Sequence, residues 1–164
     1  GVGHDHNASI NLLTILEING LEDCLWALRA TEQNCNKVAQ LIAADYAESV
    51  LSIFESQFPD DMRPRKAIMA VRRYALGQIG TEELKAASDV AWALAWASRP
   101  NEWSAAWAVW AARDAALHNA PEVAWIVACN AAAASGAARG APAHREDIVK
   151  RYLLPSVGCE ERGR

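Results

Sequence analysis

One arginine and one histidine in the second half of the chain have the types and spacing that acid–base chemistry on a phosphate requires. Arg113 and His118 are separated by four residues in the run Arg-Asp-Ala-Ala-Leu-His. A histidine can accept or donate a proton near neutral pH, and an arginine can stabilise charge that develops on a phosphate. An ordinary amphipathic helix with a histidine near its C-terminal end has the same residues. The pattern therefore permits a nuclease without requiring one.

The same pair resembles the R-x4-6-H motif of HEPN ribonucleases. That resemblance implies a composite site, formed across a helical dimer, in which Arg113 and His118 act on an RNA phosphodiester. Other catalytic patterns are missing from the sequence, since no H-E-x-x-H pair occurs and no serine or threonine has a His and acid arrangement at a recognisable elbow. His4 and His6 lack further positioned metal ligands. We therefore expect no enzyme, no metal site and no cofactor, with the HEPN-like nuclease as the alternative.

A corner rich in proline, aspartate and arginine is the most strongly specified local feature of the sequence. Residues 58–68 read FPDDMRPRKAI. Pro64 suits the first turn of a helix, where its missing N–H would have been unpaired in any case. Asp60 or Asp61 can cap that helix. These three residues are therefore expected to form a structural corner.

Four arginines belong to this corner and to the helix after it, namely Arg63, Arg65, Arg72 and Arg73. The first two can make two-pronged pairs with nearby carboxylates such as Asp45, Glu48 or Asp114. As an alternative, all four line a face that recognises an anion, although no glycine-rich phosphate loop accompanies them. All four are candidate partner-binding residues.

Tryptophans recur at helical spacing in two groups. Trp92 and Trp96 lie four residues apart, and a second group has spacings of four and three, namely Trp103, Trp107 and Trp110. Alanines between them allow helices to approach closely while the indoles fill the remaining gaps of a core. The alternative is that some of these rings anchor a partner, because tryptophan is enriched at interface hot spots. The second group supplies three further candidate partner-binding residues.

Helices must position all these residues, because no strand-like alternation of β-branched residues appears. Apolar spacing, caps, prolines and glycines predict the following segments: a short helix capped by Asn7 or Ser9 and closed by Gly20, then 21–30, 36–58, 64–76 with Gly77 as its C-cap, a helix capped by Thr81 that stops near Pro100, 101–119, 121–136 and 143–154. The predicted fold class is all-α, as a single compact bundle of about seven or eight helices. The domain is expected over residues 9–154, after a disordered or expression-derived start (1–8) and before a polar C-terminal tail (155–164).

Composition and charge narrow the class of protein. The 164 residues are 22% charged, and a net charge of -4 argues against broad capture of nucleic acid or of an anionic membrane. The four cysteines form no C-x-x-C pair and are expected to be small buried hydrophobic residues. Because we find neither a signal peptide nor a membrane span, a cytoplasmic location is expected.

Several segments together resemble the immunity-five-like family of putative immunity proteins, namely DCLWALR at 23–29, the block 59–68, YALGQI at 74–79 and the alanine- and tryptophan-rich helices. The family is associated with bacterial polymorphic-toxin loci and also occurs in phage or prophage genomes. The resemblance runs from about Leu21 to Gly140. It implies a non-enzymatic protein that inhibits a toxin or a defence effector through protein–protein interaction, and it carries over no catalytic residue. A homodimer is a further possibility, and the density of tryptophan suggests a specialised binding face.

Overall fold

Six helices make up the part of the chain that the computed structural model describes, residues 11–28, 36–97 and 142–154. In chain order they are α1 (Leu12–Ile18), α2 (Leu21–Ala27), α3 (Asn36–Glu55), α4 (Arg63–Ala75), α5 (Thr81–Ala97) and α8 (Pro142–Leu153). No strand occurs in these ranges, so the all-α prediction is confirmed. The helices expected at 101–119 and 121–136, and the expected terminal segments, lie outside the described residues. The domain span of 9–154 therefore stays a prediction.

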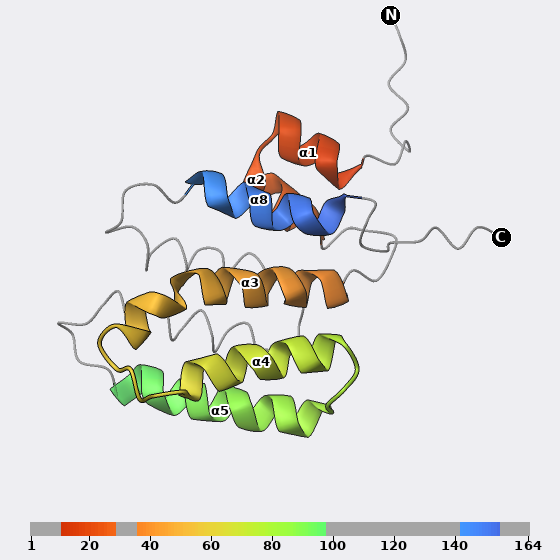
Figure 1. Ribbon diagram of the computed structural model, residues 1–164. Coiled ribbons are helices and arrows are strands. Elements are labelled where there is room, and N and C mark those ends of the chain that lie inside the picture. Colours follow the sequence, from red (N-terminus) through yellow and green to blue (C-terminus); the bar gives the residue numbers. More distant parts are fainter. Residues whose placement is uncertain (1–10, 29–35, 98–141, 155–164) are drawn as a thin grey trace, which may run out of the picture.

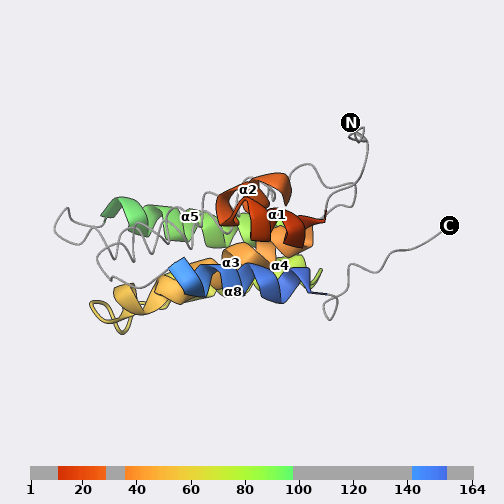
Figure 2. The same ribbon diagram turned by 90° about the horizontal axis from the view of Figure 1, so that it is seen from above.

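The long helix α3 lies in the middle of the described fold. The helices α4 and α5 lie on one side of it, and α8 with the α1–α2 hairpin lies on the other (Figure 1). The view from above shows α8 running along α3 rather than across it (Figure 2). None of the described helices has the length and apolar character that crossing a membrane requires.

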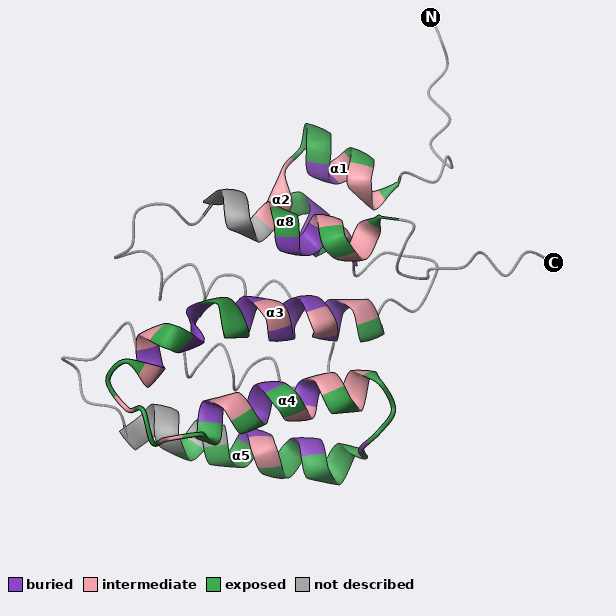
Figure 3. Cartoon of the chain, in the orientation of Figure 1, coloured by how far each residue is buried: buried purple, intermediate pink, exposed green. Residues whose placement is uncertain are grey.

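The hydrophobic core is centred on α3, whose buried side chains recur every three or four residues (Figure 3). Ala39, Ala43 and Ala47 lie four apart and are fully buried, so neighbouring helices can approach the α3 backbone closely. Tyr46 and Phe54 fill the wider spaces. The other helices contribute Leu16, Cys24, Leu25, Ile68, Val71, Leu84, Ile148 and Val149, together with Leu28, which follows α2.

The described core contains no tryptophan. The indole of Trp26, on α2, is 58% exposed. The side chains of Trp92 and Trp96 on α5, like the whole of residues 103, 107 and 110, fall outside the described part of the chain. Packing of the tryptophan groups in a core therefore stays a prediction.

The helix ends differ from the expected ones by a few residues. The first helix begins after Asn11, whose side-chain oxygen accepts the N–H of Leu13 at 2.8 Å, rather than after Asn7 or Ser9. The second ends at Ala27 instead of residue 30. The third ends at Glu55 instead of residue 58; Phe58 precedes Pro59, and proline disfavours the helical conformation of the residue before it.

The helix α4 ends at Ala75 with Leu76 as its C-cap, one residue before the C-cap that we expected, Gly77. The φ of Gly77, 71°, lies in the left-handed region, where glycine is unstrained. The N–H of Gly77 donates to the carbonyl of Tyr74 and the N–H of Gln78 to that of Arg73, both at 2.8 Å. Thr81, expected as the cap of the next helix, is instead the first residue of α5.

Candidate functional site

The corner between α3 and α4 is held by Asp61. Its Oδ1 accepts the backbone N–H of Arg63 at 3.1 Å and the Nε of the same arginine at 2.8 Å. These hydrogen bonds from Arg63 lower the pKa of Asp61 below its usual value. Asp61 thus supplies the acceptor for the first residue of α4, while Asp60 is exposed and Pro64 is buried in the first turn. Beside the corner lies an open hollow of about 460 Å³, lined by Gln57, Phe58, Pro59, Asp60 and Asp61.

Arg65 pairs with the last residue of α3. Its Nε and Nη2 atoms donate to Oε1 and Oε2 of Glu55, at 2.7 and 2.8 Å. The two-pronged pairing that we expected is therefore present, but Glu55 is the partner rather than Asp45 or Glu48. The reason is the tight corner, which places the end of α3 beside the first turn of α4.

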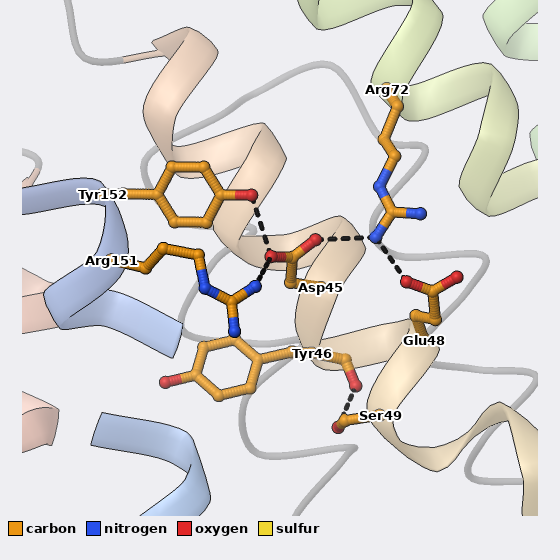
Figure 4. A network of polar contacts seen from close by, with 7 residues as sticks. All are labelled: Asp45, Tyr46, Glu48, Ser49, Arg72, Arg151 and Tyr152. Atoms are coloured by element: carbon orange, nitrogen blue, oxygen red, sulfur yellow. Dashed lines mark hydrogen bonds and ion pairs between the residues drawn. The ribbon is translucent and has the colours of Figure 1, made fainter. Parts of the chain in front are cut away.

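Asp45 lies at the centre of a polar network that joins three helices (Figure 4). Its Oδ1 accepts a hydrogen bond from Nη2 of Arg72 at 2.6 Å. Its Oδ2 accepts hydrogen bonds from the hydroxyl of Tyr152 at 2.8 Å and from Nη1 of Arg151 at 3.1 Å. The same Nη2 of Arg72 donates to Oε2 of Glu48 at 2.6 Å. The Asp45 side chain is only 10% exposed. The network therefore ties α8 to α3 and α4.

Arg72 and Glu48 of this network shift each other's pKa values because they are hydrogen-bonded to each other. The hydrogen bond from Arg72 lowers the pKa of Glu48, and the carboxylates raise the pKa of Arg72, its bond to Glu48 having the largest effect. Burial, followed by the hydrogen bond to Asp45, raises the pKa of Tyr152 to about 12. A depression of about 210 Å³ lies here, lined by Asp45, Glu48, Ser49, Arg72, Ile148 and Arg151. Because its two arginines and two carboxylates balance in charge, the site is better suited to holding helices together than to binding an anion.

The solvent-facing side of α4 has a different character. Five exposed residues follow it at spacings of four and three, and we call them the α4 seam: the N-cap Met62, then Lys66, Met69 and Arg73 within the helix, and the C-cap Leu76. The apolar members are 44%, 53% and 53% exposed in chain order. The seam lies opposite the buried side of the helix, which is formed by Pro64, Ala67, Ile68 and Val71. The two cations, Lys66 and Arg73, form no ion pair with a carboxylate in the described ranges.

The structure thus separates the four candidate arginines. Arg63, Arg65 and Arg72 are each bonded to a carboxylate of the chain itself, and only Arg73 extends into the seam without such a pair among the described residues. Sequence reasoning missed the other four seam residues, although the seven-residue spacing of Met62, Met69 and Leu76 was a signal for them. It also missed the pairing of Asp45 with Arg151 and Tyr152, which no local pattern could reveal.

The structure does not test the remaining residues that the sequence offered as catalytic or partner-binding candidates. Arg113 and His118, and the three tryptophans of the second group, lie outside the described residues. Within the described ranges, no cluster of three or more His, Cys, Asp or Glu side chains could hold a metal ion.

Cys24 is a free, fully buried cysteine. Its thiol donates to the carbonyl of Leu12 at 3.4 Å, and burial raises its pKa to about 11. The expected role of small buried hydrophobic residue is therefore confirmed for Cys24, while the other three cysteines lie outside the described ranges.

Comparison with protein families gives a match that covers most of the chain. A family model described as Imm-5 like putative immunity protein matches residues 29–152, a range that includes the corner, the Asp45 network and the α4 seam. Searches of curated proteins and of solved structures found no match.

Proposed function

The chain belongs to the Imm-5 like family of putative immunity proteins, and from this premise we propose that it neutralises a toxin or a defence effector by binding to it, without catalysing a reaction. An inhibitor of this kind needs affinity and steric cover, and no reactive group. The match gives no support to a HEPN-like nuclease built on Arg113 and His118. A bacterial toxin locus or a prophage is the genetic setting that the proposal implies.

The observation that carries the proposal is the α4 seam. Met69 in α4 and the two residues that cap its ends, Met62 and Leu76, are exposed at a spacing of seven residues, so their side chains can be covered together by one partner. Over 14 residues a helix rises about 21 Å, a length that the centre of a protein interface can cover. Large apolar side chains that gather on a surface in this way favour a protein-binding role over scattered chance exposure.

A cytoplasmic site of action is part of the proposal. The thiol of Cys24 is free, as expected in a reducing compartment. The partner would then be a toxin or effector that acts inside the cell.

Growth protection tests the proposal. The toxins encoded beside this gene would be expressed in a sensitive bacterial host, with and without the wild-type chain. Two variants would be compared: Met69→Asp, in the seam, and the matched control Val90→Asp, which places the same charge at a 46% exposed position on α5. We expect the wild type and Val90→Asp to restore growth and Met69→Asp to fail, because the change removes the central apolar side chain of the seam and adds a carboxylate that can neutralise Lys66 and Arg73.

A second measurement separates binding from catalysis. Toxin incubated with the purified chain should lose activity at a one-to-one ratio while its intact mass is unchanged. Failure of the wild type against every toxin of its own locus would contradict neutralisation. A covalently altered toxin, produced by a small fraction of an equivalent of the chain, would contradict the non-enzymatic mode.

A further inference from the structure

The α4 seam has the repeat of a helix–helix contact, with apolar and cationic side chains in alternation. Met62, Met69 and Leu76 are seven residues apart, and so are Lys66 and Arg73. In heptad terms the apolar residues take the d positions and the cations the a positions. We infer that the seam binds an amphipathic helix of the partner that carries carboxylates opposite Lys66 and Arg73, an inference that rests on the proposed function.

The straightness of the seam favours a helix as its occupant. Residues seven apart on a helix are about 10 Å apart along its axis, so both the apolar and the cationic rows repeat at about 10 Å. A second helix packed at a shallow angle presents side chains with the same repeat, and its side chains can insert between those of the seam. Met62 and Met69 are the two methionines of the whole chain, and this flexible side chain adapts well to a partner's surface.

The charges of the seam favour an acidic occupant. Arg63, Arg65 and Arg72 are bonded to Asp61, to Glu55 and to the pair Asp45 and Glu48, so their charges are compensated within the chain. Lys66 and Arg73 have no such compensation in the described part of the molecule. Covering them with a neutral surface would leave two cations desolvated and unpaired, whereas facing carboxylates would offset that cost.

The same two charges argue against a second copy of this chain as the occupant. In a parallel pairing Lys66 would face Lys66, and Arg73 would face Arg73. That arrangement places like charges against each other, which is how helical interfaces exclude parallel self-association. An antiparallel pairing places a positions against d positions, so Lys66 and Arg73 would face apolar side chains and be buried without a counter-charge.

Binding measurements on charge-reversed chains test the inference. The probe is the purified toxin that the growth assay identifies, in an inactive form that the wild type still binds. Lys66→Glu/Arg73→Glu reverses the seam, and Lys37→Glu/Lys85→Glu makes the same change in net charge at exposed positions on α3 and α5. Circular dichroism and size-exclusion chromatography with light scattering would establish that each chain is folded and report its oligomeric state.

We expect the seam double variant to bind at least about 30-fold more weakly, mainly through slower association, and the control to remain within about threefold of the wild type. The wild-type affinity should also fall as salt is raised, with a slope that the seam variant lacks. Equal affinities of the two double variants, or wild-type dimers that the seam variant abolishes, would overturn this inference while leaving the proposed function intact. If the wild type bound no toxin of its locus, both the proposed function and the inference would fall.

Discussion

Loss of the Asp45 charge should destabilise the fold more than loss of the Glu48 charge, although both carboxylates bond to Arg72. Asp45→Asn and Glu48→Gln are nearly isosteric changes on the same helix and therefore form a matched pair. Asp45 is 10% exposed and accepts hydrogen bonds from Arg72, Arg151 and Tyr152. Glu48 is 45% exposed and accepts from Arg72.

The magnitude follows from the partners of each carboxylate. The hydrogen bond that the Tyr152 hydroxyl donates to the Asp45 carboxylate is charge-assisted, and replacing that carboxylate by a neutral amide weakens it by about 1 kcal/mol. The pair with Arg72, whose side chain is 31% exposed, contributes about 1 kcal/mol after solvent screening, and the pair with the 59% exposed Arg151 adds a few tenths at most. Asp45→Asn should therefore cost about 2 kcal/mol, whereas the exposed Glu48→Gln should cost about 0.5 kcal/mol or less.

Urea and thermal unfolding, followed by far-ultraviolet circular dichroism, measure this difference. In a chain of this length, about 2 kcal/mol lowers the midpoint of thermal unfolding by roughly 4–8 °C. Equal losses in the two variants, or no loss in Asp45→Asn, would refute the interpretation of Asp45 as the residue that ties α8 to α3 and α4.

Three further predictions concern other parts of the fold. The pKa of Tyr152 is raised from 10.0 to about 12, so the stabilisation from its neutral hydroxyl is complete below pH 10 and is lost as the pH rises through 12. The difference in unfolding free energy between wild type and Tyr152→Phe, measured in urea, should therefore shrink between pH 10 and 12. A constant difference would contradict the assignment. Cys24 should resist alkylation by iodoacetamide at pH 8 in the folded chain, because its thiol is buried and has a pKa of about 11, and it should react on unfolding. Peptide mass spectrometry would follow the labelling. Rapid labelling of the folded chain would argue against this packing. An added Cβ meets no atom within 4 Å at Gly77 or at Gly80, so the two positions differ in backbone conformation alone. Gly77→Ala should cost about 1 kcal/mol of unfolding free energy in urea because φ of Gly77 is positive, whereas Gly80→Ala should be neutral or slightly stabilising. Equal effects would count against a backbone cause.

Within the described residues, the sequence was sufficient to predict the helices and much of the corner. The spacing of Ala39, Ala43 and Phe54 indicated the buried face of α3, and Gly77 marked the end of α4, because these signals are local and repeat with the period of the helix. The helix ends were less predictable. Whether Phe58 extends α3 depends on the turn into the following proline as well as on apolar spacing.

The candidate site was only partly predictable. Arg65 was expected in a two-pronged pair, but its partner depends on which carboxylate the corner brings near, and that is a tertiary property. The contacts of Asp45 with Arg151 and Tyr152 join residues more than 100 positions apart, beyond the reach of any local pattern. The α4 seam was visible as a spacing, but only the fold shows that Met69 and Leu76 lie on the solvent side.

The central claim, that a partner covers the α4 seam, is tested most directly by oxidation of Met62 and Met69 with hydrogen peroxide. Both side chains are exposed, and no other methionine competes for the reagent within the chain. Peptide mass spectrometry would compare their sulfoxide yields in the free chain and in a toxin complex shown to be fully occupied. The account predicts ready oxidation of both residues in the free chain and strong protection of both in the complex; oxidation at the same rate in the two states would contradict it.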